Sequence, residues 1–452
     1  MALAASHVVP APREAVWQWH TRAGALTRLT PPFIPMRPVQ QATSLASGTT
    51  IFSLPAGLRW VARHDLSRYR KGVSFRDVCI NAPMKKFAHW HHDHLFADHA
   101  EGTLITDAID TRLPPGLLEP MLAYRQRQII NDFRFLNYLD STASSPQKPV
   151  RIAMTGSHGA VGRALTAQLT TAGHNVIPLV RGKAQVGQRH WNPKYPAADL
   201  LTNIDVLVHL AGEPIFGRFN ESHKEKIYDS RVGPTQALSR LVAETPEVKT
   251  MVNASAIGYY GNDRGSEALT ESSAGGDGFL AGVVRDWEKA SAPALEAGKR
   301  VALIRTGVVL SGDGGLLPLL KMLFNTGLGG SFGGGEFWFS WIALDDLTDI
   351  YFQAIVNEEV RGPVNASAPK PVYNRDMAHI LARELGRPSF LPIPTFGPAL
   401  LLGKEGAQEL ALADQRVIPQ KLQTLGHPFR YRTLDSGIAH ELGGESLWTP
   451  SP

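Results

Sequence analysis

The sequence predicts an α/β protein whose main domain is a doubly wound parallel sheet, preceded by a smaller α+β domain. After residue 149, short and nearly continuous apolar runs alternate with glycine turns and helical patterns, which is typical of βαβ units with right-handed crossovers. Before residue 140, strand-like stretches are followed by one long helical pattern. The polar, proline-containing stretch at 140–149 separates these two regions and predicts a linker.

Composition agrees with a water-soluble protein of two or three domains. The chain has 452 residues, of which 43% are hydrophobic and 19% charged. No apolar run approaches the roughly 18 residues that a membrane span requires, and Met1–Pro12 does not have the pattern of a secretory signal. Cys79 is the only cysteine, so we expect a reducing, cytoplasmic setting. The formal charge of +5 comes from scattered bases and does not indicate nucleic-acid binding.

The secondary-structure elements follow from periodicity. In the first domain, Ile129, Phe133 and Leu136 recur on one side of a helical pattern at 119–139. In the main domain, apolar runs predict buried parallel strands at 151–154, 175–180, 205–210, 250–255 and 300–305. The expected domains are 1–140, a linker at 141–149, 150–395, and a C-terminal extension at 396–445.

A glycine-rich turn stands between the first predicted strand of the main domain and the helical stretch Arg163–Ala172. Gly156 permits a tight turn, Gly159 allows the backbone to approach a pyrophosphate, and Gly162 allows close packing of helix and strand. The helix N-terminus adds free N–H groups and the positive end of a dipole. We therefore predict a Rossmann-type dinucleotide site whose turn contains Gly156, Ser157, His158, Gly159, Val161 and Gly162.

The end of the second strand indicates which dinucleotide is bound. An NAD site usually has Asp or Glu there, to bind the ribose 2′-hydroxyl. This chain has Arg181, with Lys183 close behind. Because a guanidinium suits a 2′-phosphate, we predict NADP as the cofactor.

Together with the glycine turn, several later stretches resemble the atypical extended short-chain dehydrogenase/reductases, an epimerase-like family related to nucleoside-diphosphate-sugar epimerases. The resemblance covers nearly all of Val150–Leu442 and is carried by Leu210–Ile215, Ser230–Val232, Ser255–Gly261, Asp286–Glu288, Arg305–Ser311, Ser340–Ile342, Asp345–Asp346, Asn365–Pro371 and Val417–Leu422. It implies a cofactor-facing loop that contains Leu210, Ala211, Gly212, Glu213 and Arg218. It also implies the small C-terminal extension typical of the family.

The N-terminal segment more loosely resembles the helix-grip ligand-binding proteins of the START, polyketide-cyclase-like or SRPBCC class. The stretches that carry this resemblance are Pro12–Trp17, Ala88–Phe96, Gly102–Asp107 and the helix Glu119–Leu139. It implies a curved antiparallel sheet around the long helix and a cavity for an apolar ligand. The alternative is that this domain serves only as a scaffold.

The catalytic residues of short-chain dehydrogenases are only partly present. Ser255, at the end of a strand, is the candidate for the hydroxyl that orients the substrate oxygen. No tyrosine is followed four residues later by a lysine, and Phe279, Val283 and Trp287 form an apolar stripe where that pair is expected. Tyr259 or Tyr260 is a substitute proton donor, or both rings simply line the substrate pocket.

A run of histidines in the first domain raises the question of a metal site. The residues are His89, His91, His92, His94, Asp98 and His99. On a strand, His92 and His94 share one face, and His89 and His91 share the other. Because Trp90, Leu95 and Phe96 are interleaved, we interpret the segment as a half-exposed strand and predict no metal site.

The predicted function is an NADP(H)-binding, epimerase-like oxidoreductase that acts on a small molecule. The missing Tyr-Lys pair supports an alternative, in which the protein is a non-catalytic NADP(H) sensor or ligand-binding protein. A sugar-nucleotide epimerase proper is a third, weaker interpretation, since that chemistry needs a strong acid/base at the substrate carbon.

Overall fold

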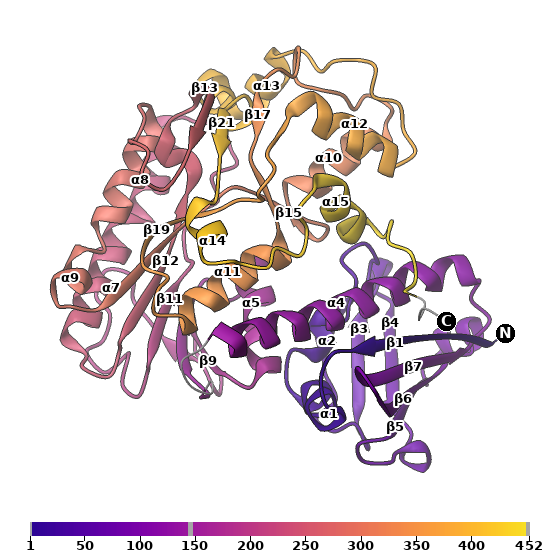
Figure 1. Ribbon diagram of the computed structural model, residues 1–452. Helices are drawn as coiled ribbons and strands as arrows, with labels where there is room; N and C mark the ends of the chain where they lie inside the picture. The colour runs from indigo at the N-terminus through magenta and orange to yellow at the C-terminus, as the bar shows by residue number, and fades with distance from the viewer. Residues whose placement is uncertain (1, 143–147, 449–452) are drawn as a thin grey trace. The chain divides into compact units, whose positions relative to one another are not determined.

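The computed structural model describes residues 2–142 and 148–448, and its residues form two compact units. The first unit comprises Met1–Ser145, Ala167–Gly173 and Ala439–Pro452, and the second comprises Pro146–Thr166 and His174–Ile438. Figure 1 colours the chain from indigo to yellow, so that the first unit is mainly indigo and purple.

The first unit is built on a seven-stranded antiparallel sheet with the order β1-β7-β6-β5-β4-β3-β2. Its strands are β1 (Ala2–Val9), β2 (Arg37–Gln40), β3 (Thr49–Ser53), β4 (Arg59–His64), β5 (Ser74–Cys79), β6 (His91–His99) and β7 (Gly102–Asp110). Its helices are α1 (Arg13–Thr21), α2 (Ala25–Arg28), α3 (Met84–Ala88) and α4 (Pro115–Thr142). The long helix α4 lies across the strands in Figure 1.

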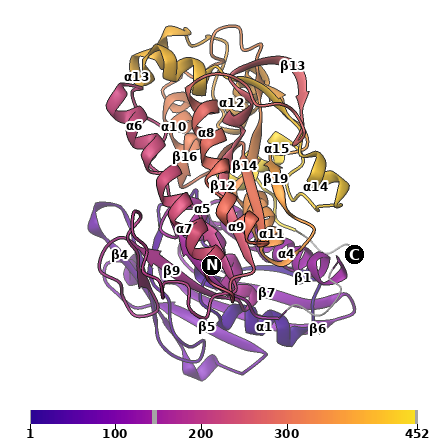
Figure 2. The ribbon, with the colours of Figure 1, turned by 90° about the vertical axis from the view of Figure 1, so that its left-hand side faces the viewer.

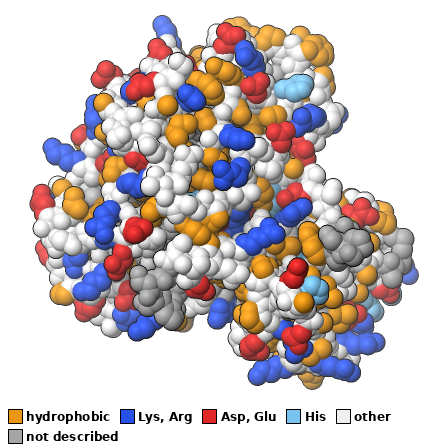
Figure 3. Space-filling view, in the orientation of Figure 1, with side chains coloured by type: hydrophobic (Ala, Val, Ile, Leu, Met, Phe, Trp, Pro, Cys, Tyr) orange, Lys and Arg blue, Asp and Glu red, His pale blue; other side chains and the backbone are white. Residues whose placement is uncertain are grey.

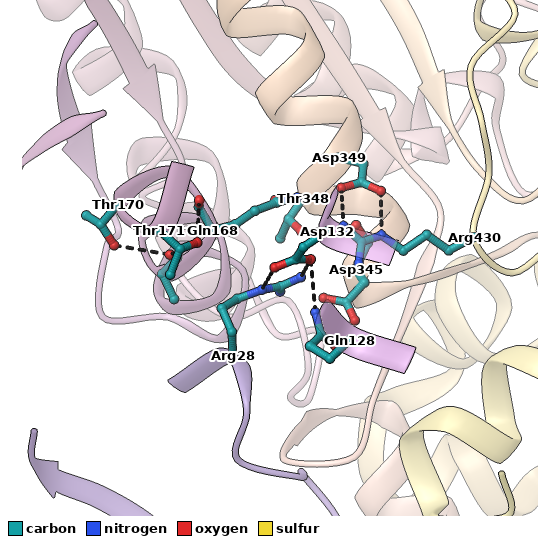
Figure 4. Close-up of polar contacts among 11 residues, drawn as sticks. Arg28, Gln128, Asp132, Gln168, Thr170, Thr171, Asp345, Thr348, Asp349 and Arg430 are labelled. Atoms are coloured by element: carbon teal, nitrogen blue, oxygen red, sulfur yellow. Dashed lines mark hydrogen bonds and ion pairs between the residues drawn. The ribbon is translucent and has the colours of Figure 1, made fainter. Parts of the chain in front are cut away.

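Helix α4 packs on the sheet through its apolar face. Ile129 and Phe133 share a core cluster with Phe75 of β5 and Phe96 of β6. The same helix is tied to α2 by an ion pair in which Arg28 Nε lies 3.0 Å from Asp132 Oδ2, shown in Figure 4. Both side chains of this pair are buried, so its charges compensate one another inside the unit.

The structure corrects two expectations for this region. Helix α4 extends beyond the predicted 119–139 and includes Ser141 and Thr142, the first two residues of the predicted linker. Residues 143–147 of that linker lie outside the described residues. The strand predicted from Ala88 begins only at His91, because Ala88 ends α3 and His89 has a left-handed backbone with φ 45°.

The second unit contains the parallel sheet, with seven strands in the order β10-β9-β8-β11-β12-β14-β19. They are β8 (Arg151–Thr155), β9 (Asn175–Val180), β10 (Arg189–His190), β11 (Val206–His209), β12 (Thr250–Ala256), β14 (Arg300–Thr306) and β19 (Gly362–Ala366). All five strands predicted from apolar runs are present, and the order reverses between β8 and β11. This confirms the Rossmann-like α/β fold. The reversal is the topological switch point at which such sheets bind ligands.

Helices cover both faces of this sheet (Figures 1 and 2). On one face, Leu238 of α7 (Val232–Glu244) and Ala294 of α9 (Ala292–Glu296) pack in a cluster with Ala153 of β8. On the opposite face, Met154 accepts a hydrogen bond from Thr166 of α5 (Ala160–Ala172). Neighbouring residues of a strand point to opposite faces, so β8 is covered on both sides.

The remaining elements surround the sheet and build the C-terminal part. The helices are α6 (Glu221–Asp229), α8 (Phe279–Lys289), α10 (Leu316–Asn325), α11 (Leu344–Val356), α12 (Asn374–Glu384), α13 (Phe396–Gly406), α14 (Gln420–Thr424) and α15 (Leu434–Leu442). The strands are β13 (Asp263–Leu269), β15 (Val308–Ser311), β16 (Gly314–Gly315), β17 (Trp338–Phe339), β18 (Trp341–Ala343), β20 (Val372–Tyr373) and β21 (Asp414–Val417). β21 pairs with β13 in parallel, and Arg430 pairs with Asp349 of α11 (Figure 4).

On the face of the molecule seen in Figure 3, acidic and basic side chains are interspersed. Within residues 2–142 and 148–448, no helix has both the length and the apolar character needed to cross a membrane.

Candidate functional site

The glycine turn joins β8 to α5 at the carboxyl edge of the parallel sheet. Gly156 has φ +69°, and a Cβ at this position would lie 2.8 Å from the carbonyl carbon of Leu210. At Gly162, a Cβ would lie 2.3 Å from the carbonyl oxygen of Gly156. Both distances are shorter than any tolerated carbon contact, so the turn holds its shape only with glycine at these two positions.

The other predicted turn residues have different environments. His158 and Gly159 are exposed, Val161 is half-buried, and Ser157 is buried. The Ser157 hydroxyl has no hydrogen-bond partner within the part of the chain that the structure describes. The glycine backbone of this turn and the N-terminus of α5 lie together at the switch point.

These features fit the phosphates of a dinucleotide. The first turn of α5 has N–H groups without intrahelical partners and the positive end of the helix dipole. Exposed backbone at Gly159 allows a phosphate to approach closely. Arg181 and Lys183 follow β9, the neighbour of β8, and both side chains are exposed.

The loop after β11, which contains Leu210, Ala211, Gly212 and Glu213, is fixed at its start by the end of β8. Thr155 Oγ1 accepts hydrogen bonds from the backbone N–H groups of Leu210 at 3.1 Å and Ala211 at 3.2 Å. The same hydroxyl lies 2.6 Å from Nδ1 of His209. The loop is therefore held directly beside the glycine turn.

The far end of this loop is held by Ser230 and Arg231. The backbone N–H of Glu213 donates to Ser230 Oγ at 2.9 Å, and Arg231 Nη2 donates to the carbonyl of Glu213 at 2.9 Å. Burial lowers the pKa of Arg231 to about 10, although the nearby charge of Glu213 acts in the other direction. Arg218 lies further along and is exposed. The structure thus fixes the backbone of Glu213 against Ser230 and Arg231 and leaves Arg218 at the surface.

Ser255, the second-to-last residue of β12, belongs to a buried network. Its Oγ donates to Glu288 Oε1 at 2.6 Å, and Arg305 donates to both oxygens of Glu288 at 2.8 Å. Arg305 stands directly opposite Ser255 in the register of β12 and β14, while Glu288 comes from α8. The side chains of Arg305 and Glu288 are only 3% and 10% exposed. A carboxylate and a guanidinium therefore fix the direction of the serine hydroxyl.

The two candidate tyrosines occupy different positions beside this network. The Tyr260 side chain is fully buried, and its hydroxyl lies 2.7 Å from Asn365 Oδ1 and accepts from Arg305 Nη1 at 3.1 Å. Burial raises the pKa of Tyr260 above its ordinary value, against the opposing effect of Arg305. Tyr259 is half-buried, and its ring lies 3.5 Å from the Arg305 guanidinium carbon. Tyr260 thus has its hydroxyl engaged by protein groups, whereas Tyr259 stacks on the cation.

Sequence reasoning missed Glu288, Arg305 and Asn365 as members of the site. All three lie in the stretches that carry the family resemblance, yet nothing local distinguishes them from ordinary polar residues. The apolar stripe of α8 was the available signal, since Val283 and Trp287 are buried and Glu288 follows them directly. The Glu288 carboxylate is itself only 10% exposed, and a carboxylate that is removed from water needs a partner, which here is Arg305.

Two family descriptions match regions that lie mainly in the second unit. Residues 152–276 match the NAD dependent epimerase/dehydratase family, and residues 393–441 match a domain of unknown function, DUF1731. The second match falls on the C-terminal extension that the resemblance implied.

Individual relatives cover the same region over nearly their full length. An epimerase family protein of Mycobacterium tuberculosis is 40% identical over 293 residues, which cover 64% of this chain and 96% of the relative. The human epimerase family protein SDR39U1 is 33% identical over 294 residues, which cover 64% of this chain and 98% of the relative.

A solved structure extends the likeness to almost the whole chain. A crystal structure described as the nucleoside-diphosphate sugar epimerase from Corynebacterium glutamicum is 57% identical with a TM-score of 0.88, covering 98% of this chain and 91% of that one. A structure of human SDR39U1 with NADPH is 30% identical with a TM-score of 0.60, covering 65% of this chain and 99% of that one. The chain therefore belongs to the epimerase family of NAD(P)-dependent, short-chain-dehydrogenase-like proteins, in the group of SDR39U1 with its C-terminal DUF1731 domain.

Proposed function

We propose that this protein is an NADP(H)-dependent oxidoreductase that acts on a small-molecule alcohol held at Ser255. The observation that carries the proposal is the buried bond from Ser255 Oγ to Glu288 at 2.6 Å, at the carboxyl end of a strand in the cofactor-binding sheet. When bound, the nicotinamide supplies or accepts a hydride.

The direction of this hydrogen bond selects the substrate group. A hydroxyl has one hydrogen and two lone pairs. Because Ser255 gives its hydrogen to the Glu288 carboxylate, only its lone pairs are left for a substrate. Ser255 therefore accepts a hydrogen bond from a substrate hydroxyl. A substrate carbonyl is disfavoured, because the lone pairs of its oxygen would face the lone pairs of Ser255 Oγ.

The same geometry gives a path for the proton of that hydroxyl. A bound alcohol can pass its proton to Ser255 Oγ while Ser255 passes its own to Glu288. Arg305 stabilises the Glu288 carboxylate through two hydrogen bonds and thereby disfavours its protonated form. We therefore expect turnover to be slow, with Glu288 as the proton acceptor in place of the missing Tyr-Lys pair.

Tyr259 is the candidate to line the substrate pocket or to donate a proton. Tyr260 is the candidate to position Arg305.

The proposed cofactor is NADP(H). Arg181 is exposed at the end of β9 and has no hydrogen bond or ion pair to another described residue, so its guanidinium is available to a 2′-phosphate. The relative SDR39U1 has been solved with NADPH. The proposed cofactor-binding residues are those of the glycine turn, the loop of Leu210–Glu213, and Arg218.

For the first unit we propose a helix-grip, SRPBCC- or START-like ligand-binding role. The support is its antiparallel sheet, its long helix α4 and a cavity of about 590 Å³ between them. Apolar side chains such as Leu29, Met36 and Trp60 line the cavity, which suits an apolar small molecule.

A non-catalytic NADP(H) sensor is the second candidate. It is favoured by the occupied hydroxyl of Tyr260 and by α8, whose residues at the usual Tyr-Lys positions are apolar. In that case the nucleotide binds without turnover.

One experiment separates these two functions. NADPH binding is measured by fluorescence titration, and a panel of alcohols and carbonyl compounds is screened with NADP⁺ and NADPH. The wild type is compared with Ser255→Ala, Glu288→Gln, Tyr259→Phe and Tyr260→Phe. Alcohol oxidation that fails in Ser255→Ala and Glu288→Gln, with NADPH affinity unchanged, supports the enzyme. Turnover that all four variants retain excludes this active site, and tight NADPH binding without any turnover favours the sensor.

A further inference from the structure

The wall of the cavity in the first unit contains three polar side chains, Asp77 of β5 and His92 and His94 of β6, and the two histidines contact a fourth, Asp107 of β7. Asp77 stands opposite His92 in the ladder, and His94 stands opposite Asp107. His92 and His94 share one face, as the sequence predicted, and it is the buried face of a half-exposed strand, with His92 3% and His94 4% exposed.

The nitrogens of the two imidazoles divide into two sets. Nε2 of His92 and Nδ1 of His94 lie 2.8 and 2.9 Å from the same oxygen of Asp107. When these nitrogens carry their hydrogens, Asp107 accepts from both rings. Nδ1 of His92 and Nε2 of His94 then present lone pairs to Asp77 Oδ2, at 3.5 and 3.2 Å.

Three electron-rich atoms that converge in this way need a cation between them. Two ligand atoms that each lie about 2.1 Å from a tetrahedral metal are about 3.4 Å apart. The two distances from Asp77 Oδ2 to the histidine nitrogens bracket that value. In the absence of a metal, a proton on one imidazole serves as the cation.

We propose that Asp77, His92 and His94 bind a divalent transition metal ion of the zinc type, with one coordination position open to the cavity. Two imidazoles and one carboxylate suit Zn²⁺ and its neighbours rather than Mg²⁺ or Ca²⁺. This site replaces the sequence-based interpretation that the histidine run binds no metal.

The surroundings of the three ligands are those of a metal site. Metal-binding histidines commonly donate a hydrogen bond from the N–H of their second ring nitrogen to a carboxylate, and Asp107 is that acceptor for both rings. Trp90 Nε1 donates to Asp77 Oδ1 at 2.9 Å, which leaves Oδ2 directed at the histidines. Arg125 lies 3.7 Å from Asp107 and balances its charge.

The cavity gives this metal a role. Asp77, His92 and His94 line the cavity of about 590 Å³, together with apolar side chains such as Leu29, Phe75 and Met121. A metal with an open position would bind an oxygen or nitrogen donor at one end of an otherwise apolar ligand. The cavity would thus hold an amphipathic small molecule by its polar end.

The test uses Zn²⁺ alone with the full chain, purified without a histidine tag and treated with a chelator. Competition with a chromophoric chelator measures affinity and stoichiometry. We expect one tightly bound Zn²⁺ per chain, with Asp77→Asn and His92→Gln weaker by more than about 100-fold and Asp107→Asn weaker by about 10–100-fold. The matched control is His91→Gln, which changes a histidine on the opposite face of the same strand and should leave affinity unchanged.

Two measurements on the wild type do not depend on how the variants fold. Zn²⁺ should raise its melting temperature, because the ion binds only the folded site. Co²⁺ should give the intense visible absorption of a low-coordinate site, and added imidazole should shift it through the open position. Three results would overturn the site. The first is a Zn²⁺ affinity of the wild type no higher than that of His92→Gln. The others are a loss of Zn²⁺ affinity in His91→Gln equal to that in His92→Gln, and a Co²⁺ spectrum of the hydrated ion. A Co²⁺ spectrum that imidazole leaves unchanged would overturn the open position.

Discussion

Ser255 and Arg305 stand side by side in the β12–β14 register and bind the same carboxylate, that of Glu288, with both donating to its Oε1 and Arg305 also to its Oε2. Ser255, which we propose orients the substrate hydroxyl, is therefore hydrogen-bonded to a buried ion pair. This relationship ties the stability of the second unit to the geometry of its candidate active site.

The first prediction concerns that ion pair. Arg305→Met leaves the Glu288 carboxylate buried without its partner, so the free energy of unfolding should fall by about 3–5 kcal/mol. The double variant Glu288→Met, Arg305→Met should lose much less than the sum of its single variants. Urea denaturation followed by tryptophan fluorescence measures all three. Arg375→Met, which breaks the exposed pair with Glu336, is the control and should change stability by about 1 kcal/mol or less. Additive losses in the double variant would show that the two groups act independently.

The second prediction concerns the glycine turn. Gly162→Ala places a methyl group 2.3 Å from the carbonyl oxygen of Gly156, so the turn must open and NADPH binding should be lost. Gly233→Ala adds the same methyl in helix α7, where nothing lies within 4 Å, and should slightly stabilise the protein without changing NADPH affinity. Fluorescence titration gives both affinities. If Gly162→Ala binds NADPH as well as Gly233→Ala, the nucleotide does not bind at this turn.

The third prediction concerns cofactor choice. Arg181→Asp replaces a group that suits a 2′-phosphate with one that suits a 2′-hydroxyl, so preference for NADPH over NADH should narrow or reverse. One charge-assisted hydrogen bond contributes about 1.5–3 kcal/mol, so a change of about tenfold or more in the affinity ratio is expected. Titration of both nucleotides measures it, and equal wild-type affinities would contradict the assignment.

The fourth prediction concerns pH. Burial, and next the charge of Arg231, lowers the pKa of His209 to about 4, against 6.5 in its ordinary state. Between these values the unfolded chain binds a proton that the folded chain does not, so neutral His209 contributes stability above pH 6.5 that is lost as pH falls through 4. The slope is about 1.4 kcal/mol per pH unit for one such group.

His209→Gln removes this contribution, so the variant should lose less stability than the wild type between pH 6.5 and 4.5. Asp346, whose pKa burial raises to about 8, acts in the opposite direction in both proteins. The comparison of the two proteins therefore isolates His209. Urea denaturation across this pH range measures the slopes, and parallel slopes would mean that His209 is protonated in the folded protein.

The sequence by itself determined the elements whose cause is local. Nearly continuous apolar runs set the strands of the parallel sheet, and the one at 175–180 matches β9 (Asn175–Val180) residue for residue. The glycine turn was readable because Gly156 and Gly162 are required by contacts within a few residues of the turn or its neighbouring strand. The end of α4 was placed too early, since polar residues such as Ser141 give no strong helical signal of their own.

Only the tertiary structure decided which polar residues meet. Glu288 stands 33 residues from Ser255 along the chain, and α8 brings the two together. Likewise, β6 is the half-exposed strand that the sequence predicted, but strand pairing places Asp77 and Asp107 on either side of His92 and His94 on its buried face. A periodic pattern reports whether a side chain faces the interior. It does not report which charged group or hydrogen-bond partner that side chain contacts, because the partner is set by sheet order and register between distant segments.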